Sequence, residues 1–297
     1  MRPTFFYTKR IKLPCFGKSV KLYLAAYSTL NVKYVRDPDY PFYRVYHTEN
    51  QNTAMNSSID LSKKVASFWH SVPLLKKNTT HNSLQRKPST ESTLKFLTND
   101  NYEENAFNMV VEIPKNSKRK YEMSKTLPYN PLVQDRFMDG TLRYFRNGPI
   151  PWNYGFLPQT WVSPCLKIKN FFGDNDPLDV LELGSTPLSR GAIVPIHILG
   201  ALALIDENCL DIKIIALREN KFKSLCKKQH DDLMKQHLNK LRFWFQTYKL
   251  YDFKPLNTFL YEGRCLSKQY VFTIIQKSFE QWQNLHKLFD SENSALC

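Results

Sequence analysis

Three aspartates lie close together in the run Phe-Gly-Asp-Asn-Asp-Pro-Leu-Asp-Val-Leu-Glu-Leu, which covers residues 172–183. Two carboxylates about 4 Å apart repel by roughly 4 kcal/mol at an effective dielectric of about 20. A folded loop that holds Asp174, Asp176 and Asp179 therefore needs cations among them, and a hard divalent metal ion suits this charge. A solvated turn is the alternative, because Gly, Asn, Asp and Pro are also ordinary turn residues.

Two further segments carry acidic residues at the edges of strand candidates. Asp206 and Asp211 close an apolar run, and Lys213 follows them. Lys120 and Glu122 lie upstream, where a spacing of two residues along a strand places both side chains on one face. Three acid-bearing segments at strand edges predict one shared pocket and favour the metal site over the solvated turn.

The elements that would position these residues are mainly strands, with helices after them. Strand candidates cover residues 42–47, 107–113, 142–145, 180–183, 193–205 (as two segments) and 212–217. Helical periodicity covers 231–248 and 267–289. This order predicts a small barrel packed by helices, in a single domain over residues 37–290 with a short tail at 291–297. Residues 76–101 are rich in Lys, Asn, Ser and Thr and predict a flexible insertion.

The first 36 residues differ in composition from the remainder. They contain eight Lys or Arg residues and no Asp or Glu, with apolar residues between them. This composition is typical of an organelle-targeting presequence, so we predict a mitochondrial presequence over residues 1–36 and a place in the mitochondrial matrix. The alternative is a disordered basic arm that binds nucleic acid or nothing, since Pro3 and Pro14 oppose a helical presequence; the protein would then be cytoplasmic.

Charge and cysteine content narrow the classes of partner. The chain carries a formal net charge of +15, of which the first 36 residues supply eight charges, so the remainder is only mildly basic and does not indicate a nucleic-acid partner. The six cysteines include no C-x-x-C pair, which argues against a structural zinc site and a disulfide framework. The best apolar run, 192–205, is short and contains His197 and Gly200, so we expect no membrane insertion.

Four motifs carry a resemblance to a known family. They read Phe-Asn-Met-Val-Val-Glu-Ile-Pro at 107–114, Asn-Tyr-Gly-Phe-Leu-Pro-Gln-Thr-Trp at 153–161, Gly-Asp-Asn-Asp-Pro-Leu-Asp-Val at 173–180 and Tyr-Lys at 248–249. In this order and spacing they resemble the soluble family I inorganic pyrophosphatases of the eukaryotic type. The resemblance implies an OB-like five-stranded β-barrel flanked by helices, several Mg²⁺ ions per active site, pyrophosphate as substrate and a homodimer.

The resemblance also implies a role for each matched residue. Asp176 matches the general base that takes a proton from the attacking water. Metal coordination falls to Asp174, Asp179, Asp206, Asp211 and Glu122. Phosphate oxygens are held by Lys120, Arg143, Tyr248 and Lys249, with Glu112, Tyr154 and Lys213 in support. Outside these motifs, the two tyrosines would be read as core aromatics and Lys213 as part of a surface ion pair.

The chemistry explains why these residue types occur together. Pyrophosphate is a polyanion, so an attacking water needs metal ions and basic side chains that neutralise the phosphoryl oxygens. A site rich in carboxylates and poor in histidine suits Mg²⁺ better than zinc. We expect magnesium-dependent hydrolysis of inorganic pyrophosphate to two phosphates, by direct attack of metal-activated water. His230 and His237 are expected to be solvated, and Trp152, Trp161, Trp244 and Trp282 to be core or interface residues.

Departures from the family pattern favour an alternative. The segment 147–152 is shorter than in the family and lacks a tyrosine that the family places in its active site; residues 207–210, Glu-Asn-Cys-Leu, lack the family's Gly-Glu-Thr. With the insertion, these changes suggest a catalytically weakened paralogue that acts as a scaffold or interaction protein. A nucleic-acid-binding barrel is a third interpretation, but its exposed strand edges would carry aromatic and basic residues, whereas the edges here carry acids.

Overall fold

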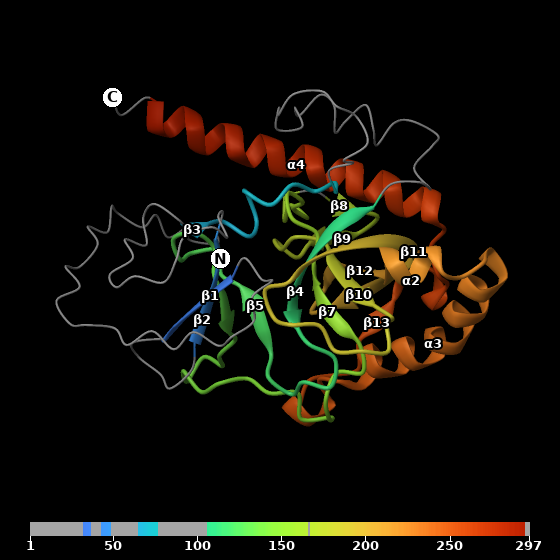
Figure 1. Ribbon diagram of the computed structural model, residues 1–297. Helices are drawn as coiled ribbons and strands as arrows, with labels where there is room; N and C mark the ends of the chain where they lie inside the picture. Colours follow the sequence, from blue (N-terminus) through green and yellow to red (C-terminus); the bar gives the residue numbers. More distant parts are fainter. Residues whose placement is uncertain (1–31, 37–42, 49–64, 77–105, 166, 295–297) are drawn as a thin grey trace, which may run out of the picture.

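A computed structural model describes residues 32–36, 43–48, 65–76, 106–165 and 167–294. Most of the predicted presequence (1–31), nearly all of the predicted insertion (77–101) and the end of the predicted tail (295–297) lie outside the described residues. Within them the chain is mainly β, with helices in its C-terminal third (Figure 1). No helix in these ranges is both long and apolar enough to cross a membrane.

Five strands pair into a closed ring, which confirms the expected five-stranded barrel. In ring order they are β11 (Ile193–Asp206), β4 (Phe107–Ile113), β7 (Asn153–Phe156), β10 (Asp179–Glu182) and β12 (Cys209–Arg218). Strand β12 closes the ring by pairing with β11, and only the β10–β12 pair in the ring is parallel. Closure leaves these strands without a free edge.

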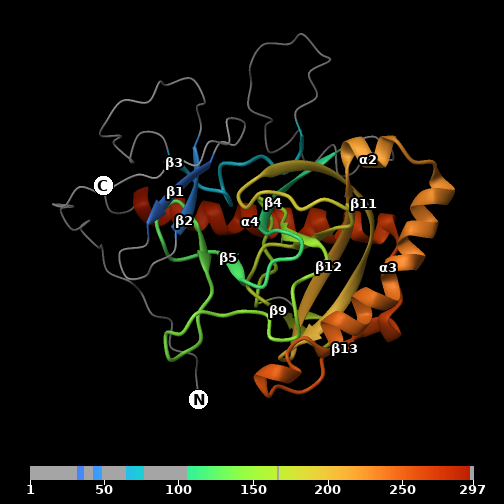
Figure 2. The ribbon, with the colours of Figure 1, turned by 60° about the horizontal axis from the view of Figure 1, so that its bottom comes forward.

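Shorter strands extend and flank the ring. They are β13 (Thr258–Phe259) on β11, β9 (Phe171–Gly173) on β12, and β8 (Lys167–Ile168) on β9. A second sheet consists of β1 (Val32–Arg36), β2 (Tyr43–Thr48), β6 (Leu132–Gln134) and β5 (Tyr121–Met123), with β3 (Val65–Ala66) on β2. Strand β1 takes the last residues of the predicted presequence. In both views the strands β1, β2 and β3 lie on one side of the barrel and the helix α3 (Lys227–Thr247) lies on the other (Figure 2).

The two long helices confirm the predicted ones, with different ends. They are α3 (Lys227–Thr247) and α4 (Lys268–Ser294), which runs into the segment predicted as a tail. Helix α3 begins earlier than predicted because the Cys226 N–H donates to Oε1 of Gln229 at 2.9 Å in a reciprocal cap. Short helical turns complete the chain at α2 (Glu219–Lys223), η3 (Leu250–Asp252) and η4 (Leu260–Gly263).

The barrel strands differ from the prediction at two places. Strand β11 is continuous, whereas two segments were expected; its pairing with β12 shifts between Ile198 and Gly200, and this irregularity lets one strand bend and continue. The expected strand at 142–145 is wrong, since Leu142 and Tyr144 form only isolated bridges. The backbone N–H groups of this segment donate to single carbonyl groups, as Arg143 does to Asp135, and form no continuous ladder with a neighbouring strand.

The core fills the barrel and continues under α4. Every residue of β4 is buried, because the outer face of the strand is also covered, as the edge-to-face contact of Phe107 with Phe272 of α4 shows. The glycine of the Asn-Tyr-Gly-Phe motif is Gly155 on β7, where the packing of the strand against β4 leaves no room for a side chain. A Cβ atom there would lie 1.9 Å from the Val110 carbonyl oxygen, so only glycine lets β4 and β7 approach this closely.

The tryptophan prediction is confirmed for Trp152, Trp244 and Trp282, which are buried, while Trp161 is half-buried.

The prediction that His230 and His237 are solvated is wrong. His230 is buried, with its ring stacked on Phe222 at a centroid distance of 4.2 Å. His237 is half-buried and accepts a 2.9 Å hydrogen bond from the Trp152 indole. Aromatic residues outside α3 contact both imidazoles, and helical spacing alone does not reveal such packing.

Candidate active site

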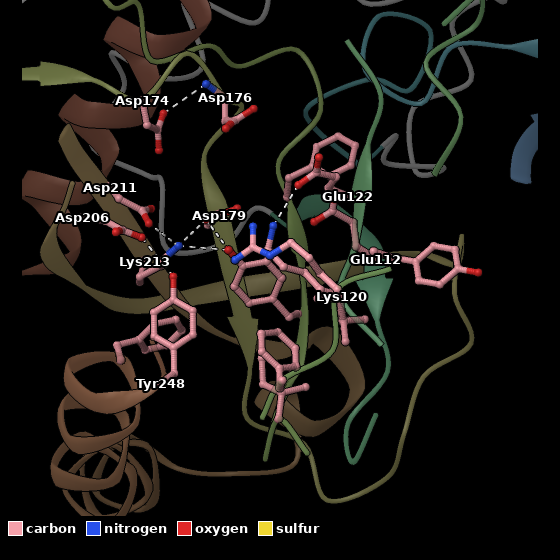
Figure 3. Close-up of a pocket in the computed structure, with 18 of the residues that line it drawn as sticks. Glu112, Lys120, Glu122, Asp174, Asp176, Asp179, Asp206, Asp211, Lys213 and Tyr248 are labelled. Atoms are coloured by element: carbon pink, nitrogen blue, oxygen red, sulfur yellow. Dashed lines mark hydrogen bonds and ion pairs between the residues drawn. The ribbon is translucent and has the colours of Figure 1, made fainter. Parts of the chain in front are cut away.

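A cavity of about 300 Å³ is lined by residues from β4, β5, β7, β10, the β11–β12 hairpin, the loop before β10 and the end of α3. All the site residues predicted from the sequence line it. They are Glu112, Lys120, Glu122, Arg143, Tyr154, Asp174, Asp176, Asp179, Asp206, Asp211, Lys213, Tyr248 and Lys249. Figure 3 shows Asp174, Asp176, Asp206 and Asp211 on one side of the cavity, facing Glu112, Lys120 and Glu122 on the other.

The acidic loop is held in shape by its own backbone and by Trp161. Asn175 adopts a left-handed conformation with φ of 65°, which asparagine tolerates better than most residues. Its side-chain oxygen accepts a 2.9 Å hydrogen bond from the Trp161 indole. The Asp176 N–H donates to a carboxylate oxygen of Asp174 at 3.1 Å. The turn therefore presents Asp174 and Asp176 side by side at the cavity.

A buried lysine joins two of the acidic segments. Lys213 on β12 pairs in register with Asp179 on the parallel strand β10. Its Nζ atom lies 2.5 Å from a carboxylate oxygen of Asp179 and 2.5 Å from one of Asp211, and it donates to the Tyr154 hydroxyl at 3.0 Å. Burial opposes the ammonium charge, but the two carboxylates outweigh it and raise the pKa of Lys213 well above its usual range.

Two carboxylates remain under-neutralised in this arrangement. Burial raises the pKa of Asp211 to about 7 despite its contact with Lys213, and its Oδ1 atom is buried without a hydrogen-bond partner. Burial and then the charge of Asp211 raise the pKa of Asp174 well above its usual range. Another positive charge nearby would favour the ionised form of both carboxyl groups.

The basic wall is organised by an aspartate that sequence reasoning missed. Asp135 follows β6 and accepts hydrogen bonds of 2.6 Å from both Lys120 and Arg143. Lys120 also lies 2.9 Å from Glu122. Burial disfavours the ionised carboxyl of Asp135, but the charge of Lys120 outweighs it and lowers the pKa of Asp135. A single aspartate with no motif around it offers no spacing signal in the sequence.

The end of α3 places Tyr248 and Lys249 against the β11–β12 hairpin. The Tyr248 hydroxyl donates to Asp206 at 3.0 Å, and its ring stacks on Trp244 at 5.0 Å. The Lys249 ammonium contacts Asp206 and lies 2.9 Å from Glu207. Because Lys249 is buried, these carboxylates hold its charge at the cavity wall.

Glu112 is a buried acid on the barrel strand β4. It accepts a 2.7 Å hydrogen bond from the Met123 N–H of β5, which ties the second sheet to the barrel. Burial raises its pKa well above the usual range, and the charge of Asp179 adds to this effect. Glu112 therefore lines the cavity on the side of Lys120 and Glu122 and links β4 to β5.

Two more side chains at the site were not among the predicted residues. Lys125 donates to a carboxylate oxygen of Asp176 at 2.6 Å and to the Asn175 carbonyl at 3.0 Å. Cys209, the first residue of β12, lines the cavity. The segment 147–152 contributes the buried Ile150 to the lining.

The donor set fits a hard divalent cation. The carboxylates provide only oxygen ligands, which Mg²⁺ prefers. The Oδ1 atom of Asp211 has no hydrogen-bond partner, and a cation would satisfy it. Lysines contact several of these carboxylates. In the part of the chain that the structure describes, no three Asp, Glu, His or Cys side chains are placed to bind one metal ion. Loading with metal therefore requires the lysine contacts to rearrange.

Comparisons with known proteins agree with this site. A family model described as inorganic pyrophosphatase matches residues 109–283. The chain is 39% identical over 226 residues to "Inorganic pyrophosphatase 2, mitochondrial" of Mus musculus, and 42% identical over 187 residues to "Soluble inorganic pyrophosphatase 6, chloroplastic" of Arabidopsis thaliana. These matches cover 73% and 61% of this chain but 66% and 62% of the relatives, slightly less than two thirds of their length.

Solved structures show the same likeness. The type I inorganic pyrophosphatase of Toxoplasma gondii matches with a TM-score of 0.68 and 31% identity, over 86% of this chain and 98% of that one. A Trypanosoma cruzi vacuolar soluble pyrophosphatase, solved in complex with PPi, matches with a TM-score of 0.70 and 26% identity, over 96% and 99% of the two chains.

Proposed function

Because this chain belongs to the inorganic pyrophosphatase family, we propose that it hydrolyses inorganic pyrophosphate to two phosphate ions. The observation that carries the proposal is the cavity of about 300 Å³ in which an acidic wall faces Lys120 and Arg143. A wall of carboxylates suits cations and a wall of ammonium and guanidinium groups suits phosphate oxygens. A small polyanion that arrives with divalent cations matches both walls.

Magnesium is the proposed cofactor, with several ions per site. Asp174, Asp179, Asp206, Asp211 and Glu122 would hold it, all from the cavity lining. When bound, Mg²⁺ neutralises phosphoryl oxygens and lowers the pKa of water, which supplies a nucleophile at neutral pH. The names of the relatives state no metal, so the donor set and the resemblance support this choice.

The remaining residues have separable tasks in the proposed reaction. Asp176, whose side chain is 48% exposed, accepts the proton of the attacking water, while Lys125 fixes its orientation. Lys120, Arg143, Tyr248 and Lys249 donate to phosphate oxygens. Lys213 keeps Asp179 and Asp211 together at the junction of β10 and β12. Water attacks phosphorus directly, so no covalent enzyme intermediate forms.

The location and assembly of the protein are proposed on indirect grounds. The basic composition of residues 1–36 supports import into the mitochondrial matrix, and the similar mouse and Saccharomyces cerevisiae proteins are named mitochondrial. The Arabidopsis relative is named chloroplastic, so similarity alone does not decide the compartment. A homodimer is proposed from the resemblance. Fluorescence imaging of the tagged full chain and of a chain lacking residues 1–36 tests the first proposal, and sedimentation of the purified chain tests the second.

Phosphate release from pyrophosphate by the purified chain tests the function directly. We expect release in the presence of Mg²⁺ and its loss in Asp176→Asn, which keeps the shape of the side chain but not its basicity. Asp232→Asn is the matched control, since Asp232 is exposed on α3. An inactive wild type that still binds metal would contradict the proposal.

The alternative is a catalytically weakened paralogue that serves as a scaffold or interaction protein. The segment 147–152 favours it, because the resemblance implies an active-site tyrosine in this loop, whereas the loop here lacks a tyrosine and contributes the apolar Ile150 to the cavity lining. Turnover separates the two functions. The weakened paralogue predicts pyrophosphate binding with little hydrolysis, and restoration of the family's longer loop at 147–152 would then raise the rate.

A further inference from the structure

Cys209 brings a thiol to the cavity, beside the carboxylates of the acidic wall. It is the first residue of β12 and pairs with Asp206 across the β11–β12 hairpin. Side chains two residues apart on a strand share a face, so Cys209 lies on the same side of β12 as Asp211, and both line the cavity. The thiol is half-buried and therefore within reach of small solutes.

The strand pairing brings a second acidic segment to the same place. Strand β9 runs parallel to the start of β12, with Phe172 opposite Cys209 and Gly173 opposite Leu210. The next residue of that segment is Asp174, which the register carries to the level of Asp211. Four carboxylates act electrostatically on the thiol, those of Asp174, Asp206, Glu207 and Asp211.

Asp211 supplies an independent sign that this wall is built to bind something. Its side chain is buried, with a relative exposure of 7%. One carboxylate oxygen is bound to Lys213 at 2.5 Å, whereas the other, Oδ1, is buried with no hydrogen-bond partner. A buried carboxylate oxygen without a donor is costly unless a cation or proton satisfies it. Oδ1 is the oxygen of Asp211 that Lys213 leaves free for a cation.

We propose that Cys209 and Asp211 form a site for a thiophilic divalent cation, such as Cd²⁺ or Zn²⁺, within the cavity that the proposed function assigns to Mg²⁺. Thiolate sulfur selects such ions over Mg²⁺, which prefers oxygen. The surrounding carboxylates attract the ion, and water completes its coordination. Cysteine reaches the ion by rotation about its single side-chain torsion.

The binding step is an exchange of cations. Cys209 Sγ loses its proton to solvent and forms a bond to the metal, Asp211 contributes Oδ1, and no electrons are transferred. A metal ion lowers the pKa of its own thiol ligand enough to deprotonate it, so the acidic surroundings do not prevent coordination. Occupation of this site removes a carboxylate from the set proposed for Mg²⁺, so the ion inhibits hydrolysis.

Cadmium titration of the purified full chain tests the site without turnover. We expect an ultraviolet thiolate-to-cadmium charge-transfer band in a chain that keeps Cys209 and Cys265 and has its other four cysteines replaced by serine, and the loss of this band when Cys209→Ser is added. Cys265→Ser is the matched control, because Cys265 is equally half-buried but lies outside the cavity. Asp211→Asn should weaken cadmium binding at least about tenfold while circular dichroism shows an unchanged fold. Excess Mg²⁺ should compete with Cd²⁺.

The outcomes separate this inference from the proposed function. A band that survives in Cys209→Ser, or that disappears in Cys265→Ser, overturns the cadmium site whatever the chain hydrolyses. Loss of the band in Cys209→Ser with no hydrolysis by the wild type supports the site and contradicts the function. If the wild type hydrolyses pyrophosphate, Cd²⁺ at a fixed Mg²⁺ concentration should inhibit it. The Cd²⁺ concentration that halves the rate should be about tenfold lower for the wild type than for Cys209→Ser.

Discussion

The ammonium nitrogen of Lys125 lies 2.6 Å from a carboxylate oxygen of Asp176. Lys125 follows β5, in the second sheet, whereas Asp176 belongs to the acidic loop before β10 in the barrel. The same ammonium donates to the Asn175 carbonyl at 3.0 Å, so a single side chain fixes both the carboxylate and the turn that carries it. The proposed general base is therefore oriented from outside its own loop.

Replacement of Lys125 should lower the rate without abolishing it. Lys125→Met frees the Asp176 carboxylate to rotate, and we expect kcat to fall roughly tenfold because a misplaced base transfers its proton less efficiently. Lys125→Arg retains the charge and should recover most of the rate. Steady-state kinetics with pyrophosphate at saturating Mg²⁺ provide the measurement. Equal kcat values for the methionine variant and the wild type would show that this contact has no role in the reaction.

Removal of Asp135 should weaken substrate binding more than the chemical step. Asp135 receives 2.6 Å hydrogen bonds from both Lys120 and Arg143, so Asp135→Asn releases two groups that are proposed to hold phosphate. We expect KM for pyrophosphate to rise about tenfold or more. Asp139→Asn is the control, because Asp139 bonds only to Thr141 in the turn after β6. A wild-type KM in Asp135→Asn would contradict the assignment.

The ion pair of Glu182 and Arg218 should matter for stability instead of activity. Glu182 is fully buried, accepts from Arg218 at 3.1 Å and from Asn153 at 2.8 Å, and joins β10 to β12 and β7. Glu182→Leu leaves these donors unpaired, and we expect a loss of about 3 kcal/mol in the free energy of unfolding. Urea denaturation measures it.

An exposed ion pair is the control for that experiment. Glu262 lies 2.6 Å from Arg264, but both side chains are more than three-quarters exposed, at 79% and 77%. Glu262→Gln should leave the stability nearly unchanged, within about 0.5 kcal/mol. Similar losses for the two variants would mean that burial does not govern the strength of the Glu182 pair.

The stability of the fold should fall in mildly acidic solution because of His197. Burial lowers its pKa below the ordinary 6.5, Glu219 opposes this, and Lys223, Lys268 and Lys76 lower it further. The neutral ring stacks on Phe222 at a centroid distance of 4.3 Å. Below about pH 6.5 the unfolded chain binds a proton that the folded chain does not yet bind, so stability is lost as the pH decreases.

His197→Phe keeps the stacked ring and removes the titrating group. We expect the free energy of unfolding of the variant to depend less steeply on pH between about 7 and 5 than that of the wild type. Denaturation curves over this range supply the comparison. Parallel pH profiles for the two proteins would exclude His197 as the source of the acid sensitivity.

Much of the barrel and of the cavity lining could be predicted from the sequence, because the signals are local. The apolar run of β4 and the two helical periodicities identify elements without reference to anything distant. The spacing of the aspartates in the acidic loop indicates shared chemistry for the same reason. The resemblance adds Arg143, Tyr248 and Lys249, which no local spacing connects to the acids.

The remainder depends on contacts that no local pattern encodes. Asp135 and Lys125 are single charged residues in turns, and their partners lie on other elements. The strands of the second sheet are as short as two or three residues, too short for periodicity to identify. The burial of His230 follows from the position of Phe222 after β12, which only the folded chain determines.

The most direct test of the account is phosphate release from pyrophosphate as Mg²⁺ is titrated from zero, in the wild type and in Asp176→Asn. We expect hydrolysis by the wild type to rise from background with added Mg²⁺ and to saturate, while Asp176→Asn loses at least about a hundredfold in kcat at every concentration. A wild type that releases no phosphate at saturating Mg²⁺, or an Asp176→Asn variant that matches the wild type, would contradict the central claim.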